Sequence, residues 1–184
     1  MDQTVTNRFL NMIAAASILG LATLPALAQG AVVPAAGAMK DFPEAHELPD
    51  PSLTYKIVFD VQSMPSSPDQ VSPALRSIGG IINTYRNHGV AADHLVFTAV
   101  FHGDTIVQIV DDATYKGRTG YDKNPNVQIL NQLKAAGVQM VVCGQSAMAQ
   151  HYDFKTILPL ATMNLSATAT FINLMTRGYI QIKA

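Results

Sequence analysis

The chain has 184 residues, enough for one ordinary domain, and its formal net charge is −1 at pH 7. Lysine and arginine are neither in excess nor clustered, which argues against a nucleic-acid partner. The single cysteine, Cys143, excludes an internal disulfide. It is therefore bridged to another molecule, buried, or free to react.

The N-terminal segment, residues 1–28, has the pattern of a secretory signal. Arg8 precedes a mostly apolar stretch over residues 9–24, and Ala26-Leu27-Ala28 forms an A-x-A cleavage pattern. The stretch is short for a membrane-spanning helix, and no stop-transfer pattern follows it. We expect cleavage before Gln29, a periplasmic location and no membrane partner for the mature protein. A retained N-terminal anchor is the alternative.

Residues 29–53 are rich in proline and alanine and show no sustained periodicity. This composition predicts an extended N-terminal arm that is poorly ordered at its start and whose later part could pack along the domain or a neighbouring subunit. Residues 54–184 contain no internal repeat, and we expect them to form one α/β domain.

That domain alternates strand patterns with helix patterns. Nearly continuous apolar runs predict three central strands, at 55–61, 94–101 and 139–143. Shorter runs predict two more strands, at 160–163 and 179–182. Cap residues, apolar spacing and terminal glycines predict helices over about 73–88, 125–136, 146–152 and 167–177. Strands that alternate with helices indicate an α/β fold with a mainly parallel sheet.

Three local features are less regular. Gly79 and Gly80 each weaken the first helix by roughly 1 kcal/mol relative to alanine, so a close contact with a strand or another helix is expected there. The apolar segment 105–110 does not reveal its type. Residues 111–123 are polar and turn-rich, and predict a mobile loop near the strand ends.

Cys143 lies where the apolar run 140–142 meets Gly144, and Gln145 and Ser146 can then open a helix. In a parallel α/β sheet this junction is the carboxyl end of a strand, where ligands and reactive groups gather. The start of a helix favours thiolate over thiol. The alternative is a buried structural cysteine that acts as a small hydrophobic residue.

His102 and Gly103 follow the second predicted strand. If the second and third strands are neighbours, His102 and Cys143 face the same crevice. A Cys/His pair is the minimum for a nucleophilic thiol, because a charged imidazole stabilises the thiolate. The alternative for His102 is a side chain that orients its own turn. Asp104 and Tyr152 could shape the pocket or lie at its rim.

The sequence predicts no metal and no cofactor. Cys143, His102 and His151 are the only plausible ligand set, and they lack CxxC or HxxxH spacing. The patterns GxSxG, GxGxxG and GxxxxGK[ST] are missing. The paired carboxylates Asp111 and Asp112 lie in a polar segment and are expected to be solvated.

Several segments, in this order and spacing, resemble the secreted branch of the DsrE/DsrF-like family: KIVFDV (56–61), VFHGD (100–104), NPNVQILNQLKAAGV (124–138), VVCGQSA (141–147) and RGYI (177–180). The resemblance covers about residues 54–183. It implies a three-layer α/β/α sandwich with a five-stranded, mainly parallel sheet, assembled into homotrimers or hexamers. It also matches Cys143 with the position that carries a persulfide in sulfur-relay members, and His102-Gly103 with the family's His-Gly.

Three functions stay open. The first is a sulfur carrier or sulfurtransferase with a persulfide on Cys143, stabilised by His102, and with a sulfur donor or acceptor protein as partner. Its ligand-binding residues would be Gly103, Gly144, Gln145 and Ser146. The second is a non-catalytic periplasmic protein for small-ligand binding or assembly, in which Cys143 is structural. The third is a redox sensor whose subunits join through Cys143.

Overall fold

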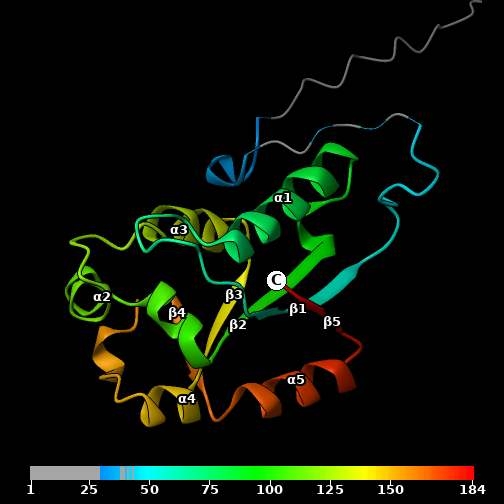
Figure 1. Cartoon of the computed structure of the whole chain (residues 1–184). Coiled ribbons are helices and arrows are strands. Elements are labelled where there is room, and N and C mark those ends of the chain that lie inside the picture. Colours follow the sequence, from blue (N-terminus) through cyan, green and yellow to red (C-terminus); the bar gives the residue numbers. More distant parts are fainter. Residues whose placement is uncertain (1–29, 38–39, 41, 43) are drawn as a thin grey trace, which may run out of the picture.

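Five parallel strands form the centre of the computed structural model (Figure 1), which describes residues 30–37, 40, 42 and 44–184. The strands are β1 (Tyr55–Val61), β2 (Leu95–Phe101), β3 (Gln139–Cys143), β4 (Ala161–Asn164) and β5 (Ile180–Lys183). Their order across the sheet is β4-β3-β2-β1-β5, and each neighbouring pair is parallel. The predicted signal segment, 1–28, lies outside the described residues.

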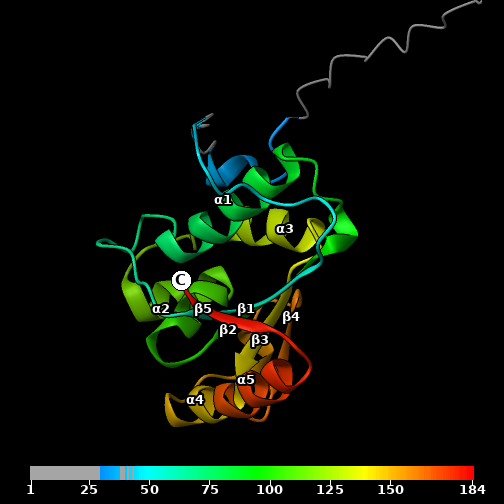
Figure 2. The same ribbon diagram turned by 90° about the vertical axis from the view of Figure 1, so that its right-hand side faces the viewer.

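Helices lie on both faces of the sheet, which confirms the predicted three-layer α/β/α fold. Helices α1 (Pro73–Asn87) and α3 (Val127–Ala135) cover one face, and α5 (Ala167–Thr176) covers the other (Figure 2). The short helix α4 (Gly144–Ala149) starts at the end of β3, on the same side as α5. The α1/α3 side holds the larger apolar core, whereas the α5 side holds a small cluster: Val58, Val100, Val141, Cys143 and Ala167.

The segment after β2, whose type the sequence leaves open, is a 3-10 helix, η3 (Gly103–Ile109). Its residues from Thr105 onward are buried, and the Thr105 hydroxyl donates to the Val61 carbonyl at 3.0 Å. This bond fixes the start of η3 against the carboxyl end of β1. Within the described part of the chain, no helix is both long and apolar enough to cross a membrane.

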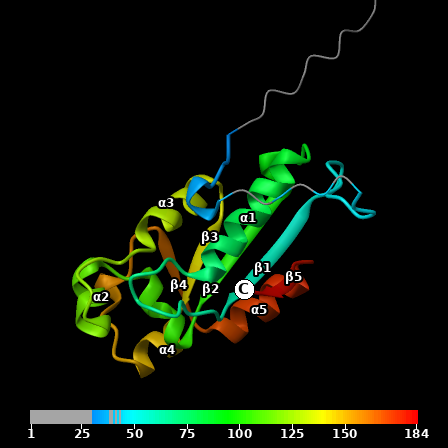
Figure 3. The same ribbon diagram turned by 45° about the horizontal axis from the view of Figure 1, so that its top comes forward.

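Residues 112–119 form a helix, α2 (Asp112–Thr119), where the sequence predicted a mobile loop (far left in Figure 3). The Asp111 side chain accepts a hydrogen bond from the Thr114 N–H at 2.8 Å, and Gly120 ends the helix with a left-handed φ of 82°. Tyr115 is its one buried residue. The helix therefore lacks the apolar stripe by which a surface helix is predicted, and its two cap residues were the remaining signal.

The arm packs near its start, not only in its later part as the sequence predicted. Val33 is fully buried and exchanges two hydrogen bonds with the side chain of Asn83 in α1, at 2.9 and 3.1 Å. The 3-10 turn η1 (Pro34–Ala36) follows and lies against α1 and α3. A Cβ at Gly79 would lie 2.5 Å from the Cβ of Ala36. The close contact expected at Gly79 is therefore with the arm.

Candidate functional site

Cys143 is both the last residue of β3 and the N-cap of α4, so strand and helix meet at its thiol. The residue is 4% exposed and belongs to the apolar cluster beneath α5. The next residue, Gly144, packs against the end of β4, where a Cβ would lie 2.9 Å from the carbonyl oxygen of Asn164. Any larger residue at 144 would push the thiol and β4 apart.

The Sγ atom of Cys143 accepts two hydrogen bonds from Ser146, one from the backbone N–H at 3.4 Å and one from the hydroxyl at 3.3 Å. Burial raises the pKa of the thiol, but these donors and the backbone N–H groups of Ala167 and Gln145 outweigh burial and lower the pKa below its ordinary value. The donors belong to the first turns of α4 and α5, whose N–H groups have no partner within their helices. These hydrogen bonds therefore stabilise the thiolate form of Cys143.

His102 follows β2, and its Nε2 lies 2.7 Å from Oδ1 of Asp60 in β1. Asp60 is 5% exposed, and its other oxygen accepts hydrogen bonds from the side chains of Gln62 at 2.8 Å and Gln181 at 3.3 Å. A buried carboxylate is stable only with such partners. The sequence interpretation did not single out Asp60. The available signal was a lone charged residue inside the apolar run 57–61.

His102 and Cys143 lie at the same edge of the sheet. Strands β2 and β3 pair in register up to Phe101 and Val142, so the two site residues take the next positions of neighbouring strands. Among the described residues, however, no hydrogen bond joins them, because His102 Nε2 pairs with Asp60 and Cys143 Sγ with Ser146.

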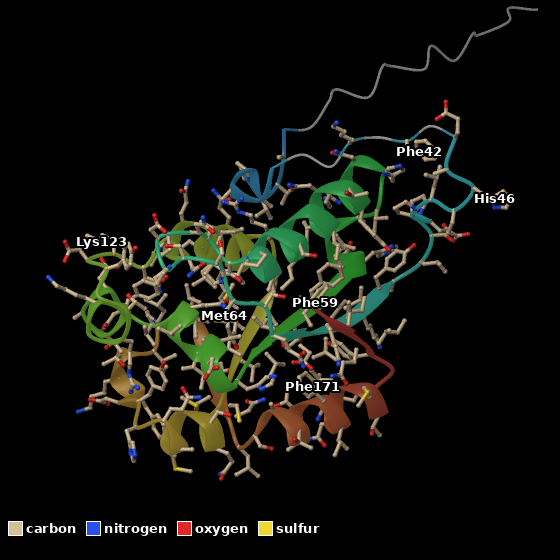
Figure 4. The ribbon with its side chains drawn as sticks, in the orientation of Figure 1. Phe42, His46, Phe59, Met64, Lys123 and Phe171 are labelled. Atoms are coloured by element: carbon tan, nitrogen blue, oxygen red, sulfur yellow. The ribbon has the colours of Figure 1, made fainter. Side chains whose placement is uncertain are left out.

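Phe171 of α5 lies near both. Its ring stands edge-on to the His102 ring, with 6.2 Å between the ring centres, and it packs against the apolar cluster that contains Cys143. Figure 4 shows Phe171 between α5 and the sheet. The imidazole and the thiol thus border the same apolar layer, and no hydrogen bond between the two described side chains joins them.

The other predicted ligand-binding residues are on either side of this edge. Gly103 opens η3 with a positive φ of 54°. Gln145 is exposed, and its N–H donates to the Leu165 carbonyl at 3.3 Å, which ties α4 to the segment before α5. Tyr152 is 8% exposed and lies under the guanidinium of Arg118, 4.2 Å from the ring centre.

In the described residues, no group of three or more His, Cys, Asp or Glu side chains is placed to hold a metal ion. His151 follows α4 with a positive φ of 56°, and its carbonyl accepts a hydrogen bond from Arg118. Asp104 is exposed. Asp112 is half-buried and pairs with Lys123, and the hydrogen bond from that lysine lowers the pKa of its carboxyl.

A family model and a solved structure are similar to this chain. The model of the DsrE/DsrF-like family matches residues 56–184, which include Cys143 and all of β2 to β5. A solved structure of a protein of unknown function, MTH1491 from Methanobacterium thermoautotrophicum, is similar at 17% identity with a TM-score of 0.49; the similarity covers 71% of this chain and 99% of that chain. Among curated proteins, no match was found. The chain belongs to the DsrE/DsrF-like family.

Proposed function

We propose that this protein is a sulfur carrier or sulfurtransferase that holds a persulfide on Cys143. Membership of the DsrE/DsrF-like family suggests a role in sulfur relay. The observation that carries the proposal is the pair of hydrogen bonds from Ser146 to Sγ, which helps to lower the pKa of the thiol despite burial. The thiolate is the form that attacks sulfur.

The proposed chemistry is a sulfur exchange. The Cys143 thiolate attacks the outer sulfur of a donor such as thiosulfate, a new S–S bond forms, and the bond to the sulfite group breaks. The electron pair leaves with sulfite, and Cys143 becomes a persulfide anion. Attack by an acceptor thiolate on the outer sulfur of that persulfide then returns Cys143 to its thiolate form. No external oxidant or reductant is needed.

His102 is proposed to act from the edge of the site. Asp60 holds its Nε2 at 2.7 Å and so fixes the ring. The ring can then stabilise the developing charge of a bound donor. Because Cys143 is 4% exposed, the proposal is for a small sulfane-sulfur donor, whose outer sulfur alone needs to touch Sγ.

The same burial favours a second candidate, a non-catalytic periplasmic binding or assembly protein in which Cys143 is structural. Iodoacetamide separates the two. A sulfur carrier reacts at Cys143 while folded, whereas a structural thiol reacts only after unfolding in urea. A disulfide between subunits at Cys143 is disfavoured, because the buried Sγ itself would have to bond to a second chain, whereas a persulfide offers its added outer sulfur to an acceptor.

We also propose that the mature protein acts in the periplasm as a homotrimer or hexamer that exchanges sulfur with a donor or acceptor protein. Support for self-association comes from large apolar side chains exposed on and beside α5: Leu165 at 74%, Ile172 at 55% and Met175 at 42%. Such patches mark contact surfaces between proteins. Sedimentation equilibrium of the purified protein gives the assembly mass; a monomer at all concentrations contradicts this proposal.

A further inference from the structure

A cavity lies on the α5 side of the sheet, the side that also holds the apolar cluster with Cys143. Helix α5 lies on this side of the sheet, together with the short helix α4 (Figure 2). The cavity between α5 and strands β2, β3 and β4 has a volume of about 440 Å³, within the range of small-molecule sites. Cys143 does not line it. Seven polar side chains do: Thr98, Gln139, Thr162, Asn164, Thr170, Asn173 and Arg177.

Among the residues that line this cavity, Thr98 has a buried hydroxyl without a hydrogen-bond partner in the described protein. The residue is 2% exposed. In the sheet it lies opposite Val58 on one side and Gln139 on the other. A hydroxyl in such a buried position is unfavourable unless something bonds to it.

Some of the polar lining is already paired within the protein. The Asn164 amide donates to the Thr170 hydroxyl at 2.9 Å, and the Thr162 hydroxyl donates to the Met140 carbonyl at 3.3 Å. These bonds hold the Asn164 and Thr162 side chains in place and leave them with few hydrogen-bonding groups for a ligand.

Further polar groups of the lining come from α5, from its C-terminal cap and from the start of β3. Arg177, at the end of α5, is the one charged residue among those that line it. In the described part of the chain no carboxylate pairs with its guanidinium. The amides of Asn173 and Gln139 lie on the same lining and are exposed.

We propose that this cavity binds a small hydroxy or keto acid, with the carboxylate on Arg177 and the hydroxyl or carbonyl oxygen near Thr98. An arginine fork matches a carboxylate in shape and charge. An amino acid is disfavoured, because no acidic side chain lines the cavity to pair with an ammonium group. The site would hold its ligand without chemistry at Cys143.

The test uses the purified full chain and three probes: L-lactate, L-malate and pyruvate. Methyl NMR shifts of Val141 and Leu174, which line the cavity, report binding at the site. We expect saturable shifts with at least one acid, and much weaker binding of lactamide, the neutral amide of lactate. Cys143→Ser is expected to bind as wild type does, so this test does not depend on the proposed sulfur chemistry.

Two variants locate the contacts. Arg177→Gln is expected to weaken binding about tenfold or more, and Thr98→Val roughly two- to tenfold, the ranges for one charged and one neutral hydrogen bond. Thr98→Val should fold as well as wild type, because valine has the same shape and the lost hydroxyl has no protein partner. Arg76→Gln on α1, across the sheet, is the matched control and should bind normally.

The proposal is overturned if none of the three acids shifts Val141 or Leu174, or if lactamide binds as tightly as lactate. Unchanged binding in both Arg177→Gln and Thr98→Val overturns it too. If no acid binds and Arg177→Gln instead weakens self-association in sedimentation, the cavity is a contact between copies of the chain, and the ligand site is excluded.

Discussion

The hydroxyl of Ser146 donates a hydrogen bond to the Sγ of Cys143 at 3.3 Å, and the backbone N–H of the same residue donates another at 3.4 Å. One residue therefore supplies two donors to a thiol that is otherwise set among apolar side chains. Burial raises the pKa of the thiol, and the hydrogen-bond donors outweigh burial and lower that pKa below its ordinary value.

Replacement of Ser146 by alanine removes the hydroxyl donor and keeps the backbone donor. We expect slower alkylation of Cys143 at neutral pH, by roughly two- to tenfold, because one hydrogen bond contributes about 0.5–1.5 kcal/mol. The midpoint of the rate against pH should move to higher pH. Stopped-flow or quenched reaction with iodoacetamide measures both. Ser66→Ala, in an exposed loop, is the control, and an unshifted profile in Ser146→Ala would count against the role of the hydroxyl.

Stability should depend on pH through Cys143. Although burial raises its pKa, the hydrogen bonds from Ser146 lower it on balance in the folded protein. The unfolded chain therefore keeps this proton to higher pH, and the thiolate adds stability as the pH rises through the folded pKa towards the ordinary value of 9.0. The contribution is complete above that value and is lost as the pH falls through the folded pKa.

The measurement is urea unfolding of wild type and Cys143→Ser at several pH values from about pH 6 to pH 9.5. Subtraction of the two free energies of unfolding removes the titration of all other groups. We expect the difference to shift in favour of wild type as the pH rises. A difference that is constant with pH, or that shifts the other way, contradicts a lowered pKa.

Asp60 should matter for stability as well as for the site. Asp60→Ala leaves His102, Gln62 and Gln181 without their shared acceptor, so we expect a loss of about 1–3 kcal/mol in the free energy of unfolding. Asp93→Ala, at an exposed position before β2, should change it by less than about 0.5 kcal/mol. Equal effects of the two substitutions would show that the buried hydrogen bonds of Asp60 contribute no more to the free energy of unfolding than an exposed carboxylate does.

The contact between the arm and α1 is tested with two glycines. Gly79→Ala places a Cβ 2.5 Å from Ala36 and 2.8 Å from Val33, and we expect a loss of about 1–3 kcal/mol from overpacking. Gly117→Ala, inside α2, meets nothing within 4 Å and should stabilise the protein by up to about 1 kcal/mol. Thermal or urea unfolding gives both values. A neutral Gly79→Ala would mean that the arm does not pack there in solution.

The sheet was predictable because its strands are marked by local pattern. The runs 55–61 and 139–143 coincide with β1 and β3, since nearly continuous apolar character is typical of strands buried on both faces. Helix α2 was not predictable in this way, because one buried tyrosine makes no apolar stripe. Likewise, nothing near Val33 in the sequence shows that it is buried against Asn83, fifty positions away.

The candidate site was predictable in its residues but not in its bonds. The position of Cys143 at a strand end follows from the local sequence, and so does the proximity of Ser146. The pairing of His102 with Asp60 depends on which strands are neighbours and on their register, which local pattern does not encode. The start of α5 near the thiol is another such long-range relationship.

Persulfide formation tests the central claim most directly. The purified protein is incubated with thiosulfate or polysulfide and its intact mass is measured, with Cys143→Ser as control. We expect wild type to gain the mass of one sulfur atom, to lose it again on addition of a reducing thiol, and the variant to gain nothing. If wild type gains no sulfur, or if Cys143→Ser gains the same mass, Cys143 is not a sulfur carrier.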